Sequence, residues 1–307
     1  MILLCGIPSE TPLAMVADEL DRLGADFVWF NQRRFAEYDL EYEIRDGGVD
    51  GSMRLGPDLY PLGSITAVYA RLMDDRLLPE LEDEPDATPN RMACRRLHES
   101  LARWLEIAPG RVVNRYGPMG SNGSKPYQAQ LITRFGFRTP ETLVTNDPDE
   151  VIRFRSRHGR VVYKSISGLR SIVTELTADD VSRLESIRNC PTQFQALVAG
   201  DDVRLHVVGE TVFATAVESD GIDYRYSGQT TGEEARLRPV EAPPEIAGRA
   251  VALSNALGLP VSGLDLMVDS DGNVYCLEVN PSPAFSYYEH NTGQPIAREI
   301  ARYLAAA

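Results

Sequence analysis

The chain has 307 residues, of which 43% are hydrophobic and 25% charged, and its formal net charge is −14 at pH 7. A length near 300 predicts about two domains, and a chain of this size buries about three quarters of its unfolded surface without disulfide or metal staples. The acidity argues against nucleic-acid binding and against adhesion to anionic membranes, both of which need basic surfaces. No stretch approaches the roughly 18 continuous apolar residues of a membrane span.

The four cysteines lie far apart in the sequence and form no CxxC pair. Cys5, Cys94, Cys190 and Cys276 therefore predict neither a disulfide framework nor a zinc site, and they favour a reducing, cytoplasmic environment. The first residues carry no basic leader and no long apolar stretch. Met1 to Gly6 thus predicts a buried strand rather than a signal peptide.

Residues 1–110 alternate predicted strands and helices, the pattern of an α/β domain with a mostly parallel sheet. The predicted elements are strands at 1–6, 26–30 and 65–71, a helix at 12–23 that Gly24 closes, and a helix from Pro89 to about 108. Residues 79–89 are acidic and proline-rich, which favours a solvated loop.

Beyond residue 110 the pattern is typical of an α+β domain with antiparallel sheets, so the fold class is α/β plus α+β. Helices are predicted at 124–135, 148–157, 243–257, from Thr177 and from about 293. Strands are predicted at 141–144, 160–165, 171–176, 192–198, 203–208, 211–218 and within 261–280. Residues 219–238 are polar and glycine-bearing, and they favour a loop.

A hairpin near the end of the chain carries the sharpest chemical pattern. Asp271 and Gly272 lie between two apolar runs and predict a two-residue turn. Pairing about that turn places Asp265 directly opposite Glu278, with Asn280 on the same face. The apolar residues expected to pack behind the acids are Leu264, Leu266, Val268, Leu277 and Val279.

Two facing carboxylates repel each other, and in so apolar a strand pair they also lose solvation at a cost of several kcal/mol. A divalent cation removes both penalties. An oxygen set of Asp265, Glu278 and Asn280 suits Mg²⁺ with phosphates completing the shell. The alternative is a hairpin edge on which both acids face water.

Four basic residues are candidates for binding phosphate. Lys125 begins a predicted helix and Lys164 ends a predicted strand, while Arg204 projects with Asp202 from one face of a strand. Arg225 lies in the polar segment that follows. Each could meet a phosphate or a developing phosphoryl charge, although each taken singly fits an exposed or ion-paired cation better.

Taken in order, these residues and the run Gly263-Leu-Asp265 to Glu278-Val-Asn280-Pro-Ser-Pro resemble the ATP-grasp superfamily. Within it, the chain is similar to the ribosomal-protein S6 glutamate ligase-like group over about residues 110–307. The resemblance implies an ATP-grasp fold with an N-terminal pre-ATP-grasp α/β domain. The implied bounds are 1–110 for that domain and 111–307 for the ATP-grasp domain, with a small lobe at about 125–190 and a large lobe at about 191–307.

The resemblance also implies the cofactors ATP and Mg²⁺ and a role for each candidate residue. Lys125 and Lys164 would hold the nucleotide phosphates, and Arg204 and Arg225 would stabilise the transferring phosphoryl group. The hinge strand against adenine would consist of Gln195, Ala196, Leu197 and Val198. Asp202 would reach the ribose, and the Mg²⁺ ligands would be Asp265, Glu278 and Asn280.

Further segments resemble the ATP-grasp peptide maturases that make graspetides (microviridin-type macrocycles). They are Ala67 to Arg71, Val113-Asn114, Pro140 to Pro148, Tyr163 to Ser167 and Asp223-Tyr-Arg225. In that group a precursor-peptide carboxylate is phosphorylated with release of ADP, and a side-chain hydroxyl or amine then displaces phosphate to close an ester or amide. Two alternatives stay open: a ligase that joins an amino acid to a small-molecule or protein-tail carboxylate, and a non-catalytic ATP-binding module. A homodimer stays open as well.

Overall fold

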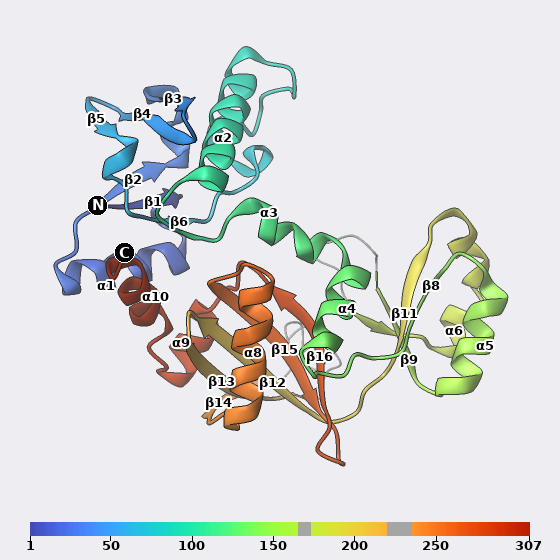
Figure 1. Ribbon diagram of the computed structural model, residues 1–307. Helices are drawn as coiled ribbons and strands as arrows, with labels where there is room; N and C mark the ends of the chain where they lie inside the picture. Colours follow the sequence, from blue (N-terminus) through green and yellow to red (C-terminus); the bar gives the residue numbers. More distant parts are fainter. Residues whose placement is uncertain (165–172, 220–234) are drawn as a thin grey trace.

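The computed structural model describes residues 1–164, 173–219 and 235–307, which form four β-sheets with helices packed on their faces (Figure 1). The N-terminal sheet is parallel throughout and has the strand order β2-β1-β6-β7. Its strands are β1 (Ile2–Gly6), β2 (Phe27–Asn31), β6 (Ala67–Ala70) and β7 (Arg111–Val113). The predicted parallel sheet is thus confirmed, and it extends three residues past the expected bound at 110.

Helices cover both faces of the parallel sheet. Helix α1 (Thr11–Leu23) packs on one face and helix α2 (Pro89–Ile107) on the other, where Trp104 is fully buried. Burial on both faces explains why β1 is an unbroken apolar run in the sequence. The predicted helix ends are confirmed: Gly24 closes α1 with φ +65°, and the Thr88 hydroxyl accepts the Arg91 N–H at the start of α2.

Two features of the N-terminal part differ from the prediction. A three-stranded antiparallel sheet follows β2, with strands β3 (Tyr38–Arg45), β4 (Gly48–Leu55) and β5 (Asp58–Pro61). Its sequence is rich in charged residues, and its buried positions are few, Met53 and Leu55 among them. The expected solvated loop at 79–89 is wrong in part, because a 3₁₀ turn there buries Leu81.

A second, antiparallel sheet has the strand order β10-β9-β11-β8. Its strands are β8 (Thr142–Thr145), β9 (Val161–Lys164), β10 (Thr174–Glu175) and β11 (Thr192–Ala196). Helices α5 (Pro148–His158) and α6 (Ala178–Val181) accompany it, and the capping box predicted at Thr177 is present. We expected the large lobe to begin at about 191, but β11 pairs with both β8 and β9, so this sheet extends to Ala196.

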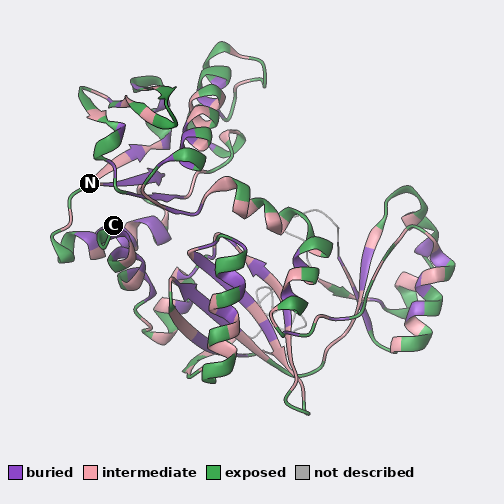
Figure 2. Ribbon diagram, in the orientation of Figure 1, coloured by how far each residue is buried: buried purple, intermediate pink, exposed green. Residues whose placement is uncertain are grey.

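The third sheet is antiparallel and has five strands in the order β14-β13-β12-β15-β16. These strands are β12 (Asp201–Val208), β13 (Thr211–Glu218), β14 (Arg236–Val240), β15 (Val261–Val268) and β16 (Val274–Asn280). One face packs against α4 (Lys125–Arg134) and α8 (Pro244–Ala256). The other is covered at one end by α9 (Ser286–Thr292), α10 (Ile296–Ala305) and α1. The buried residues of this sheet lie mainly on the central strands β12 and β15 (Figure 2).

Three expectations about this part are corrected. Helix α4, expected in the small lobe, packs on the five-stranded sheet, because Gln128 is hydrogen-bonded to the backbone of Val279. Strand β14 lies partly in the segment that favoured a loop, and α9 precedes the last predicted helix. Among the described residues, no helix is long and apolar enough to cross a membrane.

Short helical segments make most of the remaining connections. They are η1 (Gln32–Glu37), η2 (Leu62–Ser64), η3 (Asp75–Leu77), η4 (Pro79–Leu81), α3 (Tyr116–Met119), η5 (Gly120–Gly123) and η6 (Leu184–Asn189). Of these, α3 and η5 lead from the parallel sheet directly into α4 and so into the candidate site.

Candidate functional site

Asp265 and Glu278 lie directly opposite each other on β15 and β16, as the hairpin pattern predicts. The predicted turn, however, is one residue too short. The N–H of Asp269 donates to the carbonyl oxygen of Asn273 at 3.1 Å, and Gly272 has φ +78° in the loop between them. A β-bulge beside Asp265 adds one residue to β16 and so restores the predicted opposition of the two acids.

The bulge also decides which side chains accompany the acids. Leu277, expected behind them, instead lines the same cavity as Asp265 and Glu278. Cys276 takes the enclosed position, and burial raises the pKa of its thiol. Leu264, Leu266 and Val279 pack behind the acids as predicted.

Each acid is paired with a cation from another element. Lys125 Nζ lies 2.8 Å from Glu278 Oε2, and the Arg204 guanidinium donates to Asp265. The Asp265 and Glu278 side chains are only 20% and 21% exposed, so the alternative of a solvated hairpin edge is wrong. The two cations offset the repulsion that the facing carboxylates would otherwise feel.

Lys125 is held beside Glu278 by the anchoring of α4. The helix begins at Lys125, and Gln128, 2% exposed, lies one turn further on the same helix face. Its Nε2 donates to the Val279 carbonyl at 2.8 Å, and its Oε1 accepts the Val279 N–H at 2.9 Å. Sequence reasoning missed Gln128, although its i, i+3 spacing from Lys125 was the signal that could have found it.

Arg204 is confined on several sides. It faces Asp265 across the β12–β15 pair, and its guanidinium carbon lies 5.7 Å from the centre of the Tyr288 ring. A Cβ built on Gly263 would come within 2.0 Å of the Arg204 Nη2, so only glycine leaves room for this side chain. The sequence contained Gly263 in the Gly-Leu-Asp run, but gave no reason for it.

A cavity lies between the β10-β9-β11-β8 sheet, called the small-lobe sheet below, and the five-stranded sheet. Most of the residues predicted to bind nucleotide line it. It is lined by Pro140, Val162, Lys164, Val173, Gln195, Ala196, Leu197, Val198, Asp202, Asp265, Met267, Leu277 and Glu278. Lys164 is buried at the end of β9. The apolar walls suit a planar base, while the charged end that holds the acid pair suits phosphates.

Three predicted residues that the structure describes are not in this lining, namely Lys125, Arg204 and Asn280. Asn280 ends β16 opposite Gly263, and its Oδ1 accepts the Ser282 N–H at 2.9 Å. Arg225 lies outside the described residues. Lys125 adjoins the cavity through its ion pair with Glu278.

The chemistry of the donor set fits Mg²⁺. Asp265, Glu278 and Asn280 offer oxygen atoms only, and Mg²⁺ is usually bound by one or two carboxylates with water and substrate phosphates completing an octahedron. Within the ranges that the structure describes, no three or more His, Cys, Asp or Glu side chains form a metal cluster. The oxygen donors of Asp265 and Glu278 suit a metal that arrives with phosphate.

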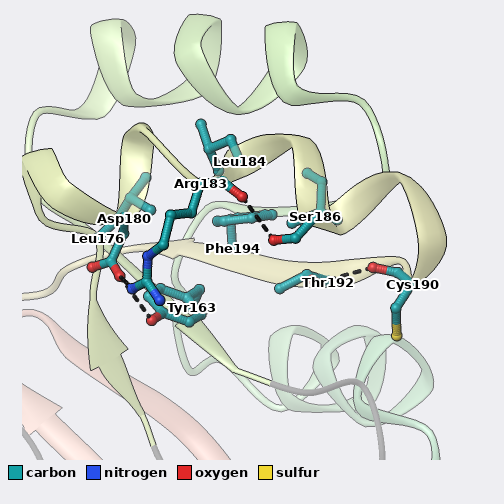
Figure 3. Close-up of a pocket in the computed structure, with 10 residues that line it drawn as sticks. Tyr163, Leu176, Asp180, Arg183, Leu184, Ser186, Cys190, Thr192 and Phe194 are labelled. Carbon is teal, nitrogen blue, oxygen red and sulfur yellow. Dashed lines mark hydrogen bonds and ion pairs between the residues drawn. The ribbon is translucent and has the colours of Figure 1, made fainter.

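A larger cavity of about 630 Å³ lies on the other face of the small-lobe sheet, β10-β9-β11-β8 (Figure 3). Its apolar lining includes Leu176, Leu184 and Phe194, and at one end Arg183 is ion-paired with Asp180 at 2.6 Å. Because side chains alternate along β9, residue 163 faces this cavity while residue 164 faces the other. The larger cavity is therefore separated from the acid pair by the sheet.

Comparison with known proteins places these observations in a family context. A family model described as the RimK-like ATP-grasp domain matches residues 123–304. A probable alpha-L-glutamate ligase of Aliivibrio salmonicida (strain LFI1238) is 31% identical over 217 residues, which are 67% of this chain and 70% of that protein.

Two solved structures are similar over almost the whole chain. One is a RiPP-associated ATP-grasp ligase of Chryseobacterium gregarium in complex with ADP and a leader and core peptide, with a TM-score of 0.83, 23% identity, and coverage of 99% of this chain and 96% of that chain. The other is the ATP-grasp ligase PsnB complexed with minimal precursor, Mg and ADP, with a TM-score of 0.77, 27% identity, and coverage of 99% and 96%.

Proposed function

The chain belongs to the RimK-like ATP-grasp family, and we propose that it matures a ribosomal precursor peptide by closing side-chain ester or amide macrocycles. It has the ATP-grasp fold and is an ATP-dependent ligase that uses Mg²⁺. The peptide substrate is supported by the likeness to the PsnB ligase complexed with minimal precursor, which is 27% identical and covers 99% of this chain with a TM-score of 0.77.

The observation that carries this proposal is the arrangement of charge at one end of the cavity. Asp265 and Glu278 face each other there, with Arg204 and Lys125 as their counter-ions. A base bound against the apolar walls would direct its phosphates toward this end. Cations and a metal site gathered around the terminal phosphate favour phosphoryl transfer over adenylation.

The reaction then runs in two balanced steps. A carboxylate oxygen of the peptide attacks the γ-phosphorus of ATP, the bond from that phosphorus to the β,γ-bridging oxygen breaks, and ADP leaves. A hydroxyl or amine of the same peptide attacks the acyl carbon, the bond from carbon to the phosphate oxygen breaks, and phosphate leaves while the nucleophile gives up a proton. Each closure removes one water from the peptide. The enzyme contributes positioning and charge stabilisation, and needs no nucleophile of its own.

The residue roles form part of the proposal. Lys125 and Lys164 bind the phosphates, and Arg204 and Arg225 stabilise the transferring group. The hinge segment consists of Gln195, Ala196, Leu197 and Val198, and Asp202 binds the ribose. Asp265, Glu278 and Asn280 would hold Mg²⁺, which when bound neutralises charge on the phosphates.

The arrangement of the molecule completes the proposal. We place a pre-ATP-grasp domain before a two-lobed ATP-grasp domain, with the bounds shifted as β7, α4 and β11 require. We propose a cytoplasmic location, where the four free thiols would stay reduced. A homodimer is compatible with this assignment.

The test uses the purified protein, Mg·ATP and a candidate precursor peptide, sought as a short neighbouring open reading frame whose product has a tail rich in Asp or Glu and in Ser, Thr or Lys. We expect ADP and phosphate to form only when peptide is present, and the peptide to lose the mass of one water per bond. Release of AMP and pyrophosphate would overturn the acyl-phosphate route. A gain in peptide mass would identify an amino-acid ligase, and nucleotide binding without carboxylate-dependent turnover would identify a non-catalytic module.

A further inference from the structure

A separate small cavity lies where the N-terminal parallel sheet meets the segment that follows β16. It measures about 180 Å³ and lies at the carboxyl ends of β1 and β6, the edge at which open parallel sheets bind ligands. Its lining is Ile7, Glu10, Ala70, Arg71, Leu72, Met73, Tyr116, Met119 and Ser282. The volume is sufficient for one side chain of a ligand.

Arg71 is the basic residue among the described residues that line this cavity. Its side chain is 11% exposed, and its Nε lies 2.8 and 2.9 Å from the two carboxylate oxygens of Glu10. Its Nη1 donates to Ser282 Oγ at 3.0 Å and to the Pro283 carbonyl at 3.2 Å. The guanidinium therefore connects the parallel sheet to the segment that follows β16.

Both walls of the cavity continue into the proposed active site. Ser282 donates its N–H to Asn280, which lies two residues after Glu278 on β16. On the other wall, Met119 ends α3, and the chain then runs through η5 to Lys125. A peptide with one side chain in this cavity would thus lie along the two segments that carry the Lys125–Glu278 pair.

The polar groups of the cavity favour an acceptor. The Ser282 hydroxyl oxygen accepts from Arg71, which leaves its own hydrogen to be donated, and none of the described residues hydrogen-bonds the Tyr116 hydroxyl. Glu10 is the lone carboxylate among the described lining residues, and Arg71 already holds it. Two hydroxyl donors beside a guanidinium suit a carboxylate, which only accepts hydrogen bonds when ionised. Because Glu10 already holds the Nε and Nη2 of Arg71, an entering carboxylate would share this cation with Glu10.

We propose that this cavity is a substrate subsite that takes one acidic side chain of the precursor peptide, with Arg71 as its counter-ion and specificity-determining residue. The assignment rests on the proposed function. It adds to that function a recognition point, apart from the reacting carboxylate, that fixes the register of the peptide against the acid pair.

A double-mutant cycle between enzyme and peptide tests the subsite. Each Asp and Glu of the candidate precursor peptide is changed singly to Asn or Gln, and binding is measured with Mg·ADP for wild type, Arg71→Gln and Arg71→Lys. We expect Arg71→Gln to weaken binding roughly 10- to 100-fold, the range for hydrogen bonds to charged groups. One peptide substitution should produce the same loss in wild type and no further loss in Arg71→Gln, while Arg71→Lys recovers part of the affinity.

Arg111 supplies the matched control. It also connects the parallel sheet to the C-terminal part, because it donates to the Tyr303 carbonyl at 2.6 Å. However, it begins β7 and so lies at the amino ends of the parallel strands, away from the cavity at their carboxyl ends. Arg111→Gln should show no coupling to any peptide residue. A loss in Arg71→Gln that is equal for all peptides, coupling to a lysine instead of an acid, or no peptide binding by wild type would each overturn the subsite. Coupling without ADP release would uphold it and overturn the proposed function alone.

Discussion

Lys125 Nζ and Glu278 Oε2 lie 2.8 Å apart although 153 residues separate them in the sequence. One belongs to the residues proposed to bind phosphate and the other to those proposed to bind Mg²⁺. Arg204 and Asp265 repeat the arrangement. Under these proposed roles, each cation would exchange a carboxylate for phosphate oxygens when nucleotide binds, and each carboxylate would become available to the metal in the same event. Such an exchange would couple metal binding to nucleotide binding.

Glu278→Gln should change the affinity for ADP in opposite directions with and without Mg²⁺. With Mg²⁺, ADP should bind roughly tenfold more weakly or worse, because one of two carboxylates for the metal is lost. Without Mg²⁺, ADP should bind more tightly, because Lys125 no longer has an acid to leave. Titration calorimetry measures both. Glu245→Gln, which removes an acid paired with Arg249 on the surface of α8, should change neither affinity, and a parallel change under both conditions in Glu278→Gln would contradict the exchange.

Gly263→Ala should lower the turnover number for ADP release by roughly 100-fold, the effect of a displacement near 1 Å in a catalytic group. The added methyl group would collide with the Arg204 guanidinium, so this cation leaves its place between Gly263 and Tyr288. Nucleotide affinity should change much less. Gly248 in α8 has open space around it, and Gly248→Ala should raise the free energy of unfolding by up to about 1 kcal/mol without affecting turnover. An unchanged rate in Gly263→Ala would mean that Arg204 does not act from this position.

Gln128→Leu should lower the free energy of unfolding by several kcal/mol. It leaves the buried N–H and carbonyl of Val279 without their partners, at about 1–3 kcal/mol for each group. Urea denaturation followed by circular dichroism gives the value. Gln130→Ala, an exposed change on the same helix, should stay within about 0.5 kcal/mol of wild type. A small effect of Gln128→Leu would show that α4 is held mainly by its apolar contacts.

Stability should fall as the pH is lowered from about 6.5 toward 4. Burial lowers the pKa of His98 to about 4, so between these values the unfolded chain takes up a proton that the folded protein refuses. The loss is on the order of 3 kcal/mol at the acid end. His206, whose pKa is also lowered by burial, adds to it. Denaturation curves across this range should show a smaller slope of stability against pH for His98→Gln than for wild type, and equal slopes would contradict the assignment.

The sequence by itself determined the elements whose signals are local. Strand β1, helices α1 and α2 and their caps follow from apolar periodicity, Gly24 and Thr88, which act within a few residues of themselves. The opposition of Asp265 and Glu278 was also predicted, but through two errors that cancel. The loop is one residue longer than its Asp-Gly pair suggested, and the bulge at Leu277 compensates.

The tertiary structure alone decided how the charges are matched and which walls meet. The β-bulge encloses Cys276 rather than Leu277, and the backbone of Arg138 is hydrogen-bonded to this part of β16, a contact that has no local sequence signature. The position of Lys125 beside Glu278 also has no local signature, because it depends on hydrogen bonds between Gln128 and Val279, which are 151 positions apart in the sequence. The free energy of a buried ion pair or hydrogen bond depends on the partner and on the desolvation that folding imposes. Sequence periodicity determines which face of a helix or strand a side chain lies on, whereas the tertiary structure determines which residues that face contacts.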